Sequence, residues 1–462
     1  MRAPEDGTVY PASPAQERLY PPMLADPEVS RAYNMSEAHR VTGPLDTRAL
    51  AAAFTAVTAR HHALRTSLRR DADGTVRQVL HSPGPHPLAH VDLTDELAGL
   101  PDTSREDALR QRLATDAEEL FPLGGTPLSR FTLYRVGEED HLVLAVVHHS
   151  VFDGWSMGLL WREVSELYRA AVTGTPPALP ESPLQFTEFA AEQHTWLGTP
   201  RARKLLDRCR KELTGFSHAV TFPYDNPAPE RKTFNGKRRV FALPEDMSDA
   251  LSRLARAENV TLAAVSLSAL CLLLRGLTGS QDVTLGIPMA NRTRASAFDA
   301  MGYFANAYVL RARPSDEGKL RELLGLSAVN LAEALTCQAV PFPAVMASLK
   351  DEYPRPPRLF RVLFTFHNEP APPLDLTGTR SMRHDLGGSV STTDVTFHVG
   401  RRDDRMTYEF QYNPDLYREA GVERFAAGYE EALRQLLGDL DRTIGETAEG
   451  LQEDALVADV QE

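Results

Sequence analysis

Apolar residues recur along this chain in two patterns, and the first is typical of amphipathic helices. Leu50, Phe54 and Val57 stand four and three residues apart, which places them on one helical face. Asp46 precedes this face at the position of a helix cap, and the pattern ends near Arg60. We therefore expect a capped helix that packs one side against a core.

The second pattern is typical of strands, and it stands directly before a further helix. Residues 131–136 and 141–147 are rich in apolar and β-branched residues, and the polar turn 137–140 separates them. The later segment is almost wholly apolar, so we expect it in the middle of a sheet. After Gly154 the apolar residues return to helical spacing. Residues 148–154 thus join a buried strand to a helix, a junction that commonly carries active-site residues.

The second half of the chain repeats this mixture of helices and strands. Its expected elements are helices at 247–257, 261–274 and 422–436 and strands at 283–287, 362–366, 394–399 and 408–412. Prolines interrupt all periodicity between Thr173 and Pro183, which indicates a linker. We therefore expect two α/β units, at 1–180 and 181–462, the second with a proline-rich bridging segment at 351–376 and a polar, frayed tail after Leu440.

Composition limits the classes of protein to which the chain can belong. With 462 residues and 42% hydrophobic content, it can bury two sizeable cores. The net charge of −13, without a dense cluster of Lys and Arg, argues against a nucleic-acid partner. Cys209, Cys271 and Cys337 are widely spaced, and we interpret them as core thiols rather than as a disulfide framework or zinc site. No apolar run reaches the ~18 residues of a membrane span and no signal peptide is evident, so we expect a soluble, cytoplasmic protein.

Two adjacent histidines supply the candidate chemistry. On a strand His148 and His149 point to opposite faces, so we expect one to act chemically and the other structurally. A neutral imidazole, whose ordinary pKa is ~6.5, is suited to accept a proton at cellular pH. Asp153 and Gly154 predict a tight turn and the start of a helix, where free N–H groups can stabilise an oxyanion. A metal site is disfavoured because no third ligand stands at useful spacing.

Several segments resemble the condensation domains of nonribosomal peptide synthetases and their acyltransferase relatives. Residues 147–156, VHHSVFDGWS, resemble the signature HHxxxDGxS of that family. Residues 13–20, SPAQERLY, resemble its element SxAQxRLW, and residues 60–68, RHHALRTSL, resemble RHxxLRTxF. Residues 302–306, GYFAN, look like GxFVN. The elements follow the family's order over essentially the whole chain.

The resemblance implies a fold and a role for each matched residue. Members of the family consist of two chloramphenicol acetyltransferase-like α/β sandwich lobes, arranged as a V-shaped pseudo-dimer with the active-site tunnel between them. His149 would contact the attacking nucleophile, with His148 and Gly154 completing the catalytic group, although His148 would pack beneath the site. Asp153 would turn away to pair with Arg65, which gives both a structural role. The residues expected along the substrate tunnel are Asn306, Ser13, Gln16, Trp155 and Ser156.

The resemblance also implies the reaction and its partners. We expect acyl transfer from a phosphopantetheine thioester on a separate carrier protein to an amine or a hydroxyl, forming an amide or an ester. The enzyme would be a free-standing monomer with no bound cofactor, metal or membrane. Carrier proteins are usually acidic, so docking on a chain of net charge −13 requires a local basic or apolar patch.

Two other functions compete with this expectation. The first is transfer of an acyl group from coenzyme A or a polyketide carrier to an alcohol, through the same His149. The second is hydrolysis, because residues 154–158 fit G-x-S-x-G with Ser156 as nucleophile and a late histidine as base. The serine stands well beyond the preceding strand, unlike the nucleophile of a hydrolase elbow, and this disfavours hydrolysis.

Overall fold

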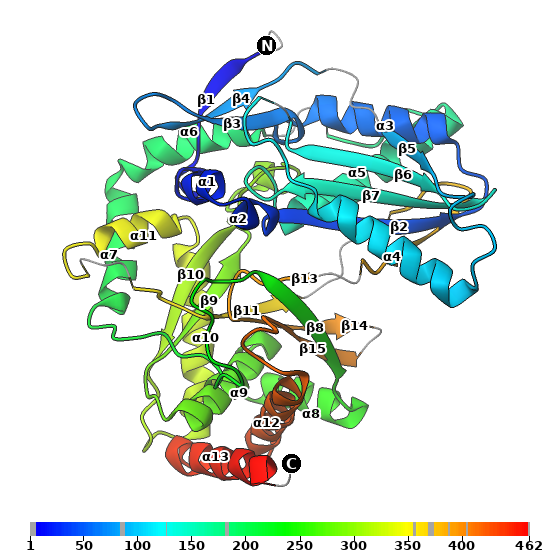
Figure 1. The fold of residues 1–462 in the computed structure, drawn as a ribbon. Helices are drawn as coiled ribbons and strands as arrows, with labels where there is room; N and C mark the ends of the chain where they lie inside the picture. Colours follow the sequence, from blue (N-terminus) through cyan, green and yellow to red (C-terminus); the bar gives the residue numbers. More distant parts are fainter. Residues whose placement is uncertain are drawn as a thin grey trace. The chain divides into compact units, whose positions relative to one another are not determined.

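The chain forms two compact units, each a mixture of helices and sheet (Figure 1). The first comprises Met1–Ala202, Ala290–Ala305 and Ala371–Gly388, and the second comprises Arg203–Met289, Asn306–Pro370 and Ser389–Glu462. The computed structural model describes residues 6–83, 88–125, 127–180, 184–353, 357–367, 374–386, 389–402 and 405–460, with the backbone alone at 389, 402 and 453–460.

The two units are not the contiguous halves that the linker predicts. The first unit continues beyond residue 180, because helix α6 (Phe186–Leu197) packs against strand β1 (Thr8–Pro11). It also takes in strand β12 (Arg380–His384), which pairs with β2 (Asn34–Thr42). Two expected segments lie partly outside the described residues, namely the linker at 181–183 and the bridging segment at 354–356 and 368–373.

The first unit is built on a five-stranded sheet in the order β12, β2, β7, β6, β5, with a three-stranded sheet in the order β1, β4, β3. Its further strands are β7 (Asp140–His148), β6 (Ser129–Arg135), β5 (Ala89–Asp92), β4 (Val76–Leu80) and β3 (Thr66–Arg70). Its further helices are α1 (Pro14–Ala25), α2 (Pro27–Arg31), α3 (Thr47–Arg60), η1 (His62–Arg65), α4 (Asp102–Glu118), α5 (Gly154–Thr173) and η2 (Ala295–Ala297). The expected pair of strands, the helix capped by Asp46 and the helix after the histidines are confirmed.

Helices cover both faces of the five-stranded sheet, which is why β7 is buried along almost its whole length. His39 and Arg40 are neighbours on β2 and so point to opposite faces. The His39 ring lies 4.7 Å from the ring of Trp161 on α5. Arg40 forms an ion pair with Glu106 on α4. The junction between β7 and α5 is therefore held in a core from two sides.

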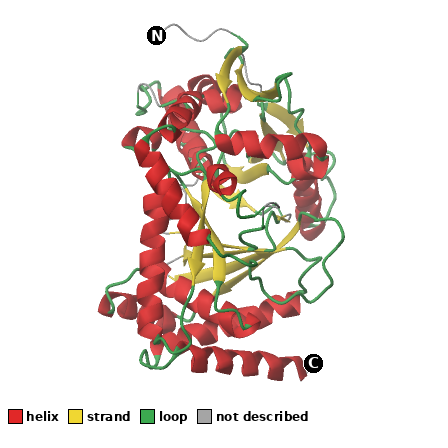
Figure 2. Ribbon diagram, turned by 90° about the vertical axis from the view of Figure 1, so that its left-hand side faces the viewer, coloured by secondary structure: helices red, strands yellow, loops and turns green. Residues whose placement is uncertain are grey.

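The second unit contains one seven-stranded sheet in the order β10, β9, β11, β14, β15, β8, β13. Its strands are β8 (Asn235–Ala242), β9 (Val283–Met289), β10 (Asn306–Ala312), β11 (Val362–His367), β13 (Ser389–Val390), β14 (Val395–Arg402) and β15 (Arg405–Tyr412). Its helices are α8 (Glu245–Ala257), α9 (Leu262–Thr278), α10 (Leu320–Cys337), α11 (Phe342–Ser348), α12 (Glu419–Leu437) and α13 (Ile444–Val460), and α7 (Pro200–Leu213) leads into it. Figure 2 shows helices of this unit gathered beside its sheet near the C-terminus.

The C-terminal tail is helical, so the expectation of a frayed tail is wrong. Helix α13 packs against α9, and Ile444, Ala448 and Leu451 are buried. A Cβ atom at Gly276 on α9 would lie 2.7 Å from the Ala448 carbonyl oxygen, so this close approach requires glycine. The many acidic residues of the tail hide the helical spacing of its three buried apolar residues.

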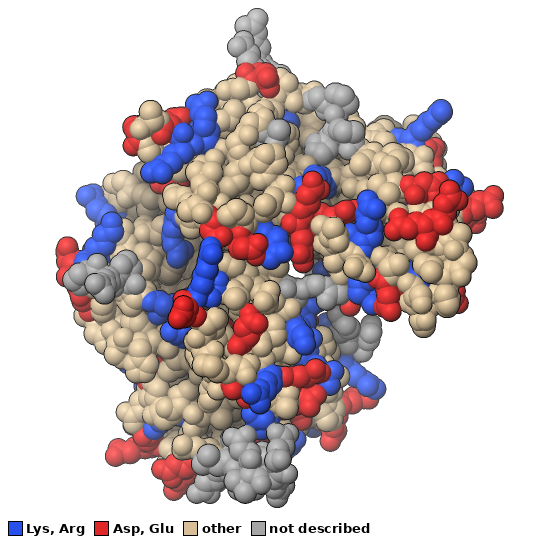
Figure 3. Space-filling model, viewed as in Figure 1, with Lys and Arg blue, Asp and Glu red and all other residues tan. Residues whose placement is uncertain are grey.

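Three further observations bear on the composition of the chain. The cysteines are free and buried, which confirms their interpretation as core thiols. On the face shown in Figure 3, Lys and Arg are interspersed with Asp and Glu rather than gathered into one basic surface. Among the described residues no single helix is long and apolar enough to cross a membrane, although two bent pairs, α8 with α9 and α10 with α11, meet the length and composition together.

Candidate active site

The histidine motif lies in the short loop between β7 and α5. His148 is the last residue of β7, and Asp153 caps α5 by accepting a hydrogen bond from the Ser156 N–H at 2.9 Å. The His149 N–H donates to the Tyr33 carbonyl oxygen at 2.7 Å. The backbone on both sides of the His149 side chain is thus fixed, by the end of a sheet and by a helix cap.

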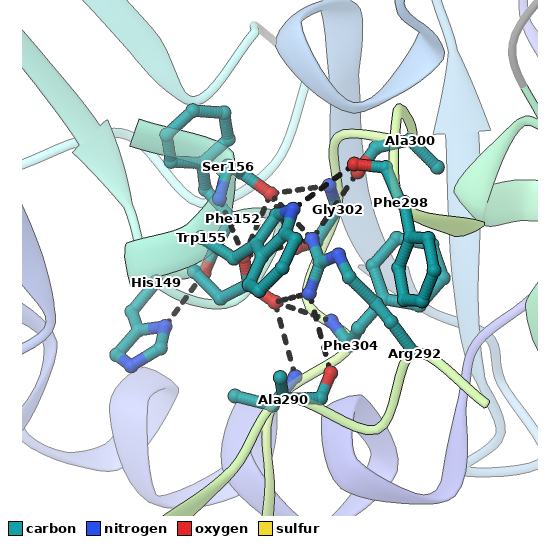
Figure 4. Close-up of polar contacts among 12 residues, drawn as sticks. His149, Phe152, Trp155, Ser156, Ala290, Arg292, Phe298, Ala300, Gly302 and Phe304 are labelled. Atoms are coloured by element: carbon teal, nitrogen blue, oxygen red, sulfur yellow. Dashed lines mark hydrogen bonds and ion pairs between the residues drawn. The ribbon is translucent and has the colours of Figure 1, made fainter. Parts of the chain in front are cut away.

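His149 is oriented by a hydrogen bond of its own ring. Its Nδ1 lies 2.6 Å from the carbonyl oxygen of Phe152 (Figure 4). A carbonyl oxygen only accepts, so Nδ1 must carry the proton of the neutral ring. Nε2 then holds a lone pair, and the half-buried ring presents it as a proton acceptor.

His148 is buried and structural. Its Nδ1 lies 2.7 Å from the Ser150 hydroxyl and its Nε2 lies 3.4 Å from the Ser30 hydroxyl. Burial, helped by nearby His149, lowers the pKa of His148 to about 4, so its ring is neutral at cellular pH. Both ring nitrogens face buried hydroxyls, so the contacts of His148 are those of a packing residue and do not support its grouping with the catalytic residues.

The Asp153 carboxylate is the centre of a buried hydrogen-bond cluster. Its Oδ1 accepts from Arg292 Nη2 at 3.1 Å, from the Ser156 N–H at 2.9 Å and from the Ser156 hydroxyl at 2.7 Å. Its Oδ2 accepts from Arg292 Nη1 at 2.9 Å and from the N–H groups of Phe304 and Ala305, both at 3.1 Å. A carboxylate that accepts from this many donors fixes the segments around it.

Arg292 is the buried counter-charge of this cluster. Its guanidinium also donates to the carbonyl oxygens of Ala290 and Ala300, both at 3.2 Å. It lies 4.4 Å from the centre of the Phe304 ring and 5.4 Å from that of Trp155 (Figure 4). Arg292 thereby ties residues 290–305 to the start of α5.

Arg65 is not the partner of Asp153, which corrects the role that the resemblance implies. Its buried guanidinium donates to the His81 carbonyl oxygen, and burial lowers its pKa. Both Arg65 and Arg292 are buried, but Arg65 ends the 3-10 turn η1, where its side chain faces the backbone after β4. Arg292 follows β9 and was missed, because a separation of 139 residues from Asp153 leaves no local pattern in the sequence.

Ser156 lies inside the cluster and not along a substrate path. It is fully buried, and its hydroxyl contacts Asp153 and the Gly302 carbonyl oxygen while accepting from the Gly302 N–H at 3.0 Å and from Arg292. Its expected place in the tunnel is therefore wrong. The same contacts oppose the hydrolase alternative, since a nucleophilic serine requires an exposed hydroxyl beside a base.

Ser13 and Gln16 are also structural rather than tunnel residues. They form a capping box at the start of α1, in which the Ser13 N–H donates to Gln16 Oε1 at 2.8 Å. The buried Gln16 amide then donates to the Ser150 carbonyl oxygen at 2.8 Å. Ser13 and Gln16 thus hold the histidine loop in place from within the core. This structural role is a physical reason for the residue types at these two positions of the N-terminal motif.

Gly154 and Trp155 are the exposed residues at the start of α5. A Cβ atom on Gly154 would meet no atom within 4 Å, and its φ is not in the left-handed region. The turn lies earlier than expected, at residues 149–151, where the Val151 N–H donates to the His148 carbonyl oxygen at 3.1 Å, and glycine leaves open space beside the first residue of the helix. Trp155 is 47% exposed and donates its Nε1–H to the Phe298 carbonyl oxygen at 3.0 Å.

Asn306 belongs to the second unit, at the start of β10. Its amide nitrogen donates to the carbonyl oxygens of Gln338 and Val340 at 2.9 and 2.6 Å, and its oxygen accepts from the Phe342 N–H at 2.9 Å. The side chain thus holds the connection between α10 and α11. Its role toward a substrate stays a prediction.

Two tyrosines beside His149 were missed by the motif reading. The ring of Tyr303 lies 5.0 Å from that of His149, and the ring of Tyr33 lies 6.1 Å from it. The only signal in the sequence is that Tyr303 occupies the open position of the GYFAN element. Among the described residues no group of three or more His, Cys, Asp or Glu side chains is placed to hold a metal ion.

The chain is similar to known proteins over almost its whole length. The family model described as Condensation domain matches residues 7–454. The phosphinothricin tripeptide synthetase PhsC of Streptomyces viridochromogenes is 33% identical over 441 residues, which are 95% of this chain and 40% of that protein. The chain spans less than half the length of the curated relatives it matches.

Solved structures give the same likeness. The X-domain from teicoplanin biosynthesis is 24% identical, with a TM-score of 0.83 over 96% of this chain and 98% of that one. The SgcC5 protein from Streptomyces globisporus, solved with an aryl ethanediol and sucrose, is 25% identical, with a TM-score of 0.74 over 94% of this chain and 100% of that one. These likenesses confirm the expected α/β fold.

Proposed function

We propose a reaction for this chain from the premise that it belongs to the condensation-domain family. Domains of this family form amide or ester bonds in natural-product biosynthesis, by moving an acyl group onto a nucleophile. For this chain the proposed donor is an acyl or aminoacyl thioester on the phosphopantetheine of a separate carrier protein. The proposed acceptor is an amine or a hydroxyl.

The observation that carries the proposal is the orientation of His149. Its Nδ1 proton is committed to Phe152, so Nε2 is the atom that accepts a proton from the acceptor. In the proposed step the nucleophile attacks the thioester carbonyl and gives its proton to Nε2. The new C–N or C–O bond forms, the C–S bond breaks, and the departing thiolate takes the proton from His149.

Two further features support this step. A Cβ atom at Gly154 would meet no atom within 4 Å, so there is open space beside the first residue of α5, where a free N–H of the helix start would stabilise a developing oxyanion. Asp153 is fully occupied by buried donors, so it positions the loop and is not available as the base. An alcohol acceptor is supported by SgcC5, which was crystallised with a diol.

The test is mass spectrometry of loaded carriers incubated with this chain and a panel of amines and alcohols. We expect product from carrier thioesters, and His149→Ala should lower the rate by ~100-fold to 10,000-fold while the protein stays folded. Acyl coenzyme A with an alcohol tests the O-acyltransferase alternative in the same assay. Product from a free acid and ATP, or a His149→Ala variant within a few-fold of the parent, would overturn the proposal.

A further inference from the structure

The Tyr303 side chain has no structural use for its hydroxyl. Among the described residues no hydrogen bond reaches this hydroxyl, and the Tyr303 side chain is half-buried by its exposed surface. Buried tyrosines elsewhere in the first unit do bond, as Tyr20 does to the Leu68 carbonyl oxygen at 2.8 Å. A phenol beside the catalytic histidine with a free donor suggests a ligand as its partner.

The backbone on both sides of Tyr303 is held by the Asp153 cluster. The Gly302 N–H donates to the Ser156 hydroxyl at 3.0 Å, and the Phe304 N–H donates to Asp153. The Tyr303 ring meets the His149 ring edge-on at 5.0 Å. The phenol is therefore placed rigidly beside His149, as a preorganised donor must be.

The protonation state of this phenol suits a hydrogen-bond donor. Burial raises the pKa of Tyr303, and the nearby Tyr33 and Asp153 act in the same direction against the opposing charge of Arg18. The hydroxyl therefore keeps its proton across the cellular pH range and can donate it to an oxygen that gains negative charge.

We infer that Tyr303 is a catalytic residue whose hydroxyl donates a hydrogen bond to the carbonyl oxygen of the donor thioester, an inference that rests on the proposed function. When the acceptor attacks, that oxygen gains negative charge while His149 gains the proton of the nucleophile. When the C–S bond breaks, the electron pair returns to the carbonyl and the bond to Tyr303 weakens. Tyr303 keeps its own proton throughout.

The test compares Tyr303→Phe with Tyr33→Phe. Both variants keep an aromatic ring beside His149 and lose one hydroxyl, so Tyr33→Phe is the matched control. We expect Tyr303→Phe to lower kcat by about 100-fold with little change in KM for the loaded carrier, as for removal of one oxyanion donor. The Tyr33 ring lies farther from the His149 ring than the Tyr303 ring does, so Tyr33→Phe should lower kcat much less than Tyr303→Phe. Equal effects of the two variants, or a Tyr303→Phe variant as active as the parent, would overturn the inference.

A binding measurement separates this inference from the proposed function. The probe is a butyrylpantetheine analogue in which an anionic tetrahedral phosphonate group replaces the thioester carbonyl. We expect the parent to bind it by calorimetry about tenfold more tightly than Tyr303→Phe, whichever acceptor the enzyme uses. If the parent forms no product from any carrier, the proposed function fails, yet this tenfold difference would still support the hydrogen bond. Equal binding by both proteins, or no binding by the parent, would refute it.

Discussion

The contacts of the buried ion pair between Asp153 and Arg292 allow us to predict how much unfolding free energy is lost when either side chain is removed. Asp153→Ala would leave the Arg292 guanidinium, whose side chain is 1% exposed, without its counter-charge. It would also leave the N–H groups of Ser156, Phe304 and Ala305 without their acceptor. Removal of one member of a buried ion pair costs roughly 3–5 kcal/mol. We expect Asp153→Ala near the upper end of this range, with a loss of turnover because the histidine loop loosens.

Arg292→Ala should cost less, about 3 kcal/mol, because the remaining carboxylate keeps four hydrogen bonds. In the double variant no charge is stranded. Its loss of unfolding free energy should therefore fall short of the sum of the two single losses by about 1–3 kcal/mol. This shortfall measures the coupling between the two side chains.

The assay is urea unfolding of the parent, both single variants and the double variant at pH 7. Arg162→Ala is the matched control, since Arg162 also joins α5 to residues 290–305 through Asp299 at 2.6 Å, but its side chain is 43% exposed. We expect this control to cost less than about 1 kcal/mol. Losses of Asp153→Ala and Arg292→Ala that add to within about 0.5 kcal/mol would refute the coupling.

Three further variants test neighbouring residues of the loop. Ser156→Ala should lower the unfolding free energy by about 1–3 kcal/mol while turnover stays near that of the parent, and an acyl adduct on Ser156 in intact-mass spectra would contradict this. Gly154→Ala should leave thermal stability unchanged and lower turnover at least about tenfold, because its Cβ fills space that only a ligand would need. Parental turnover would argue against substrate approach at this point. His148, with its folded pKa of about 4, should make unfolding easier as pH falls from ~6.5 to 4, because only the unfolded chain then gains the proton. His148→Asn should flatten this pH slope, which reaches at most ~1.4 kcal/mol per pH unit, and an unchanged slope would contradict the assignment.

Local periodicity was enough to predict the elements that carry the motif. The strand that ends at His148 and the helix after Asp153 could be predicted from apolar spacing alone. A buried face of a strand or helix requires apolar residues at regular intervals, and a short stretch of sequence is enough to show them. The limits of the units were not predictable in this way. Strand β12 completes the sheet of β2 from more than 300 residues away, and no linker composition reveals such a pairing.

The chemistry of the site could be predicted from the sequence only where the type of one residue is enough to identify its role. A histidine could be named because few side chains accept a proton at neutral pH, and the resemblance then singled out His149 rather than His148. The partner of Asp153 could not, since charge alone does not distinguish Arg65 from Arg292 and only the fold brings one of them within 2.9 Å. Ser13, Gln16 and Ser156 are polar residues of the motifs, and we therefore expected them to contact a substrate. In the structure their polar groups form hydrogen bonds within the core instead.

The position of the His149 side chain depends mainly on hydrogen bonds to backbone groups. Residues that hold this backbone therefore affect the reaction rate even though they do not take part in proton transfer. The N–H of His149 is held by the Tyr33 carbonyl and its Nδ1 by the Phe152 carbonyl. Asp153, one residue after Phe152, fixes that second carbonyl and also holds the backbone around Tyr303. A single carboxylate therefore sets both the proton acceptor and the proposed oxyanion donor. A substitution of Asp153 should therefore lower the rate through both groups at once. A substitution of His149 or of Tyr303 removes only one of the two groups.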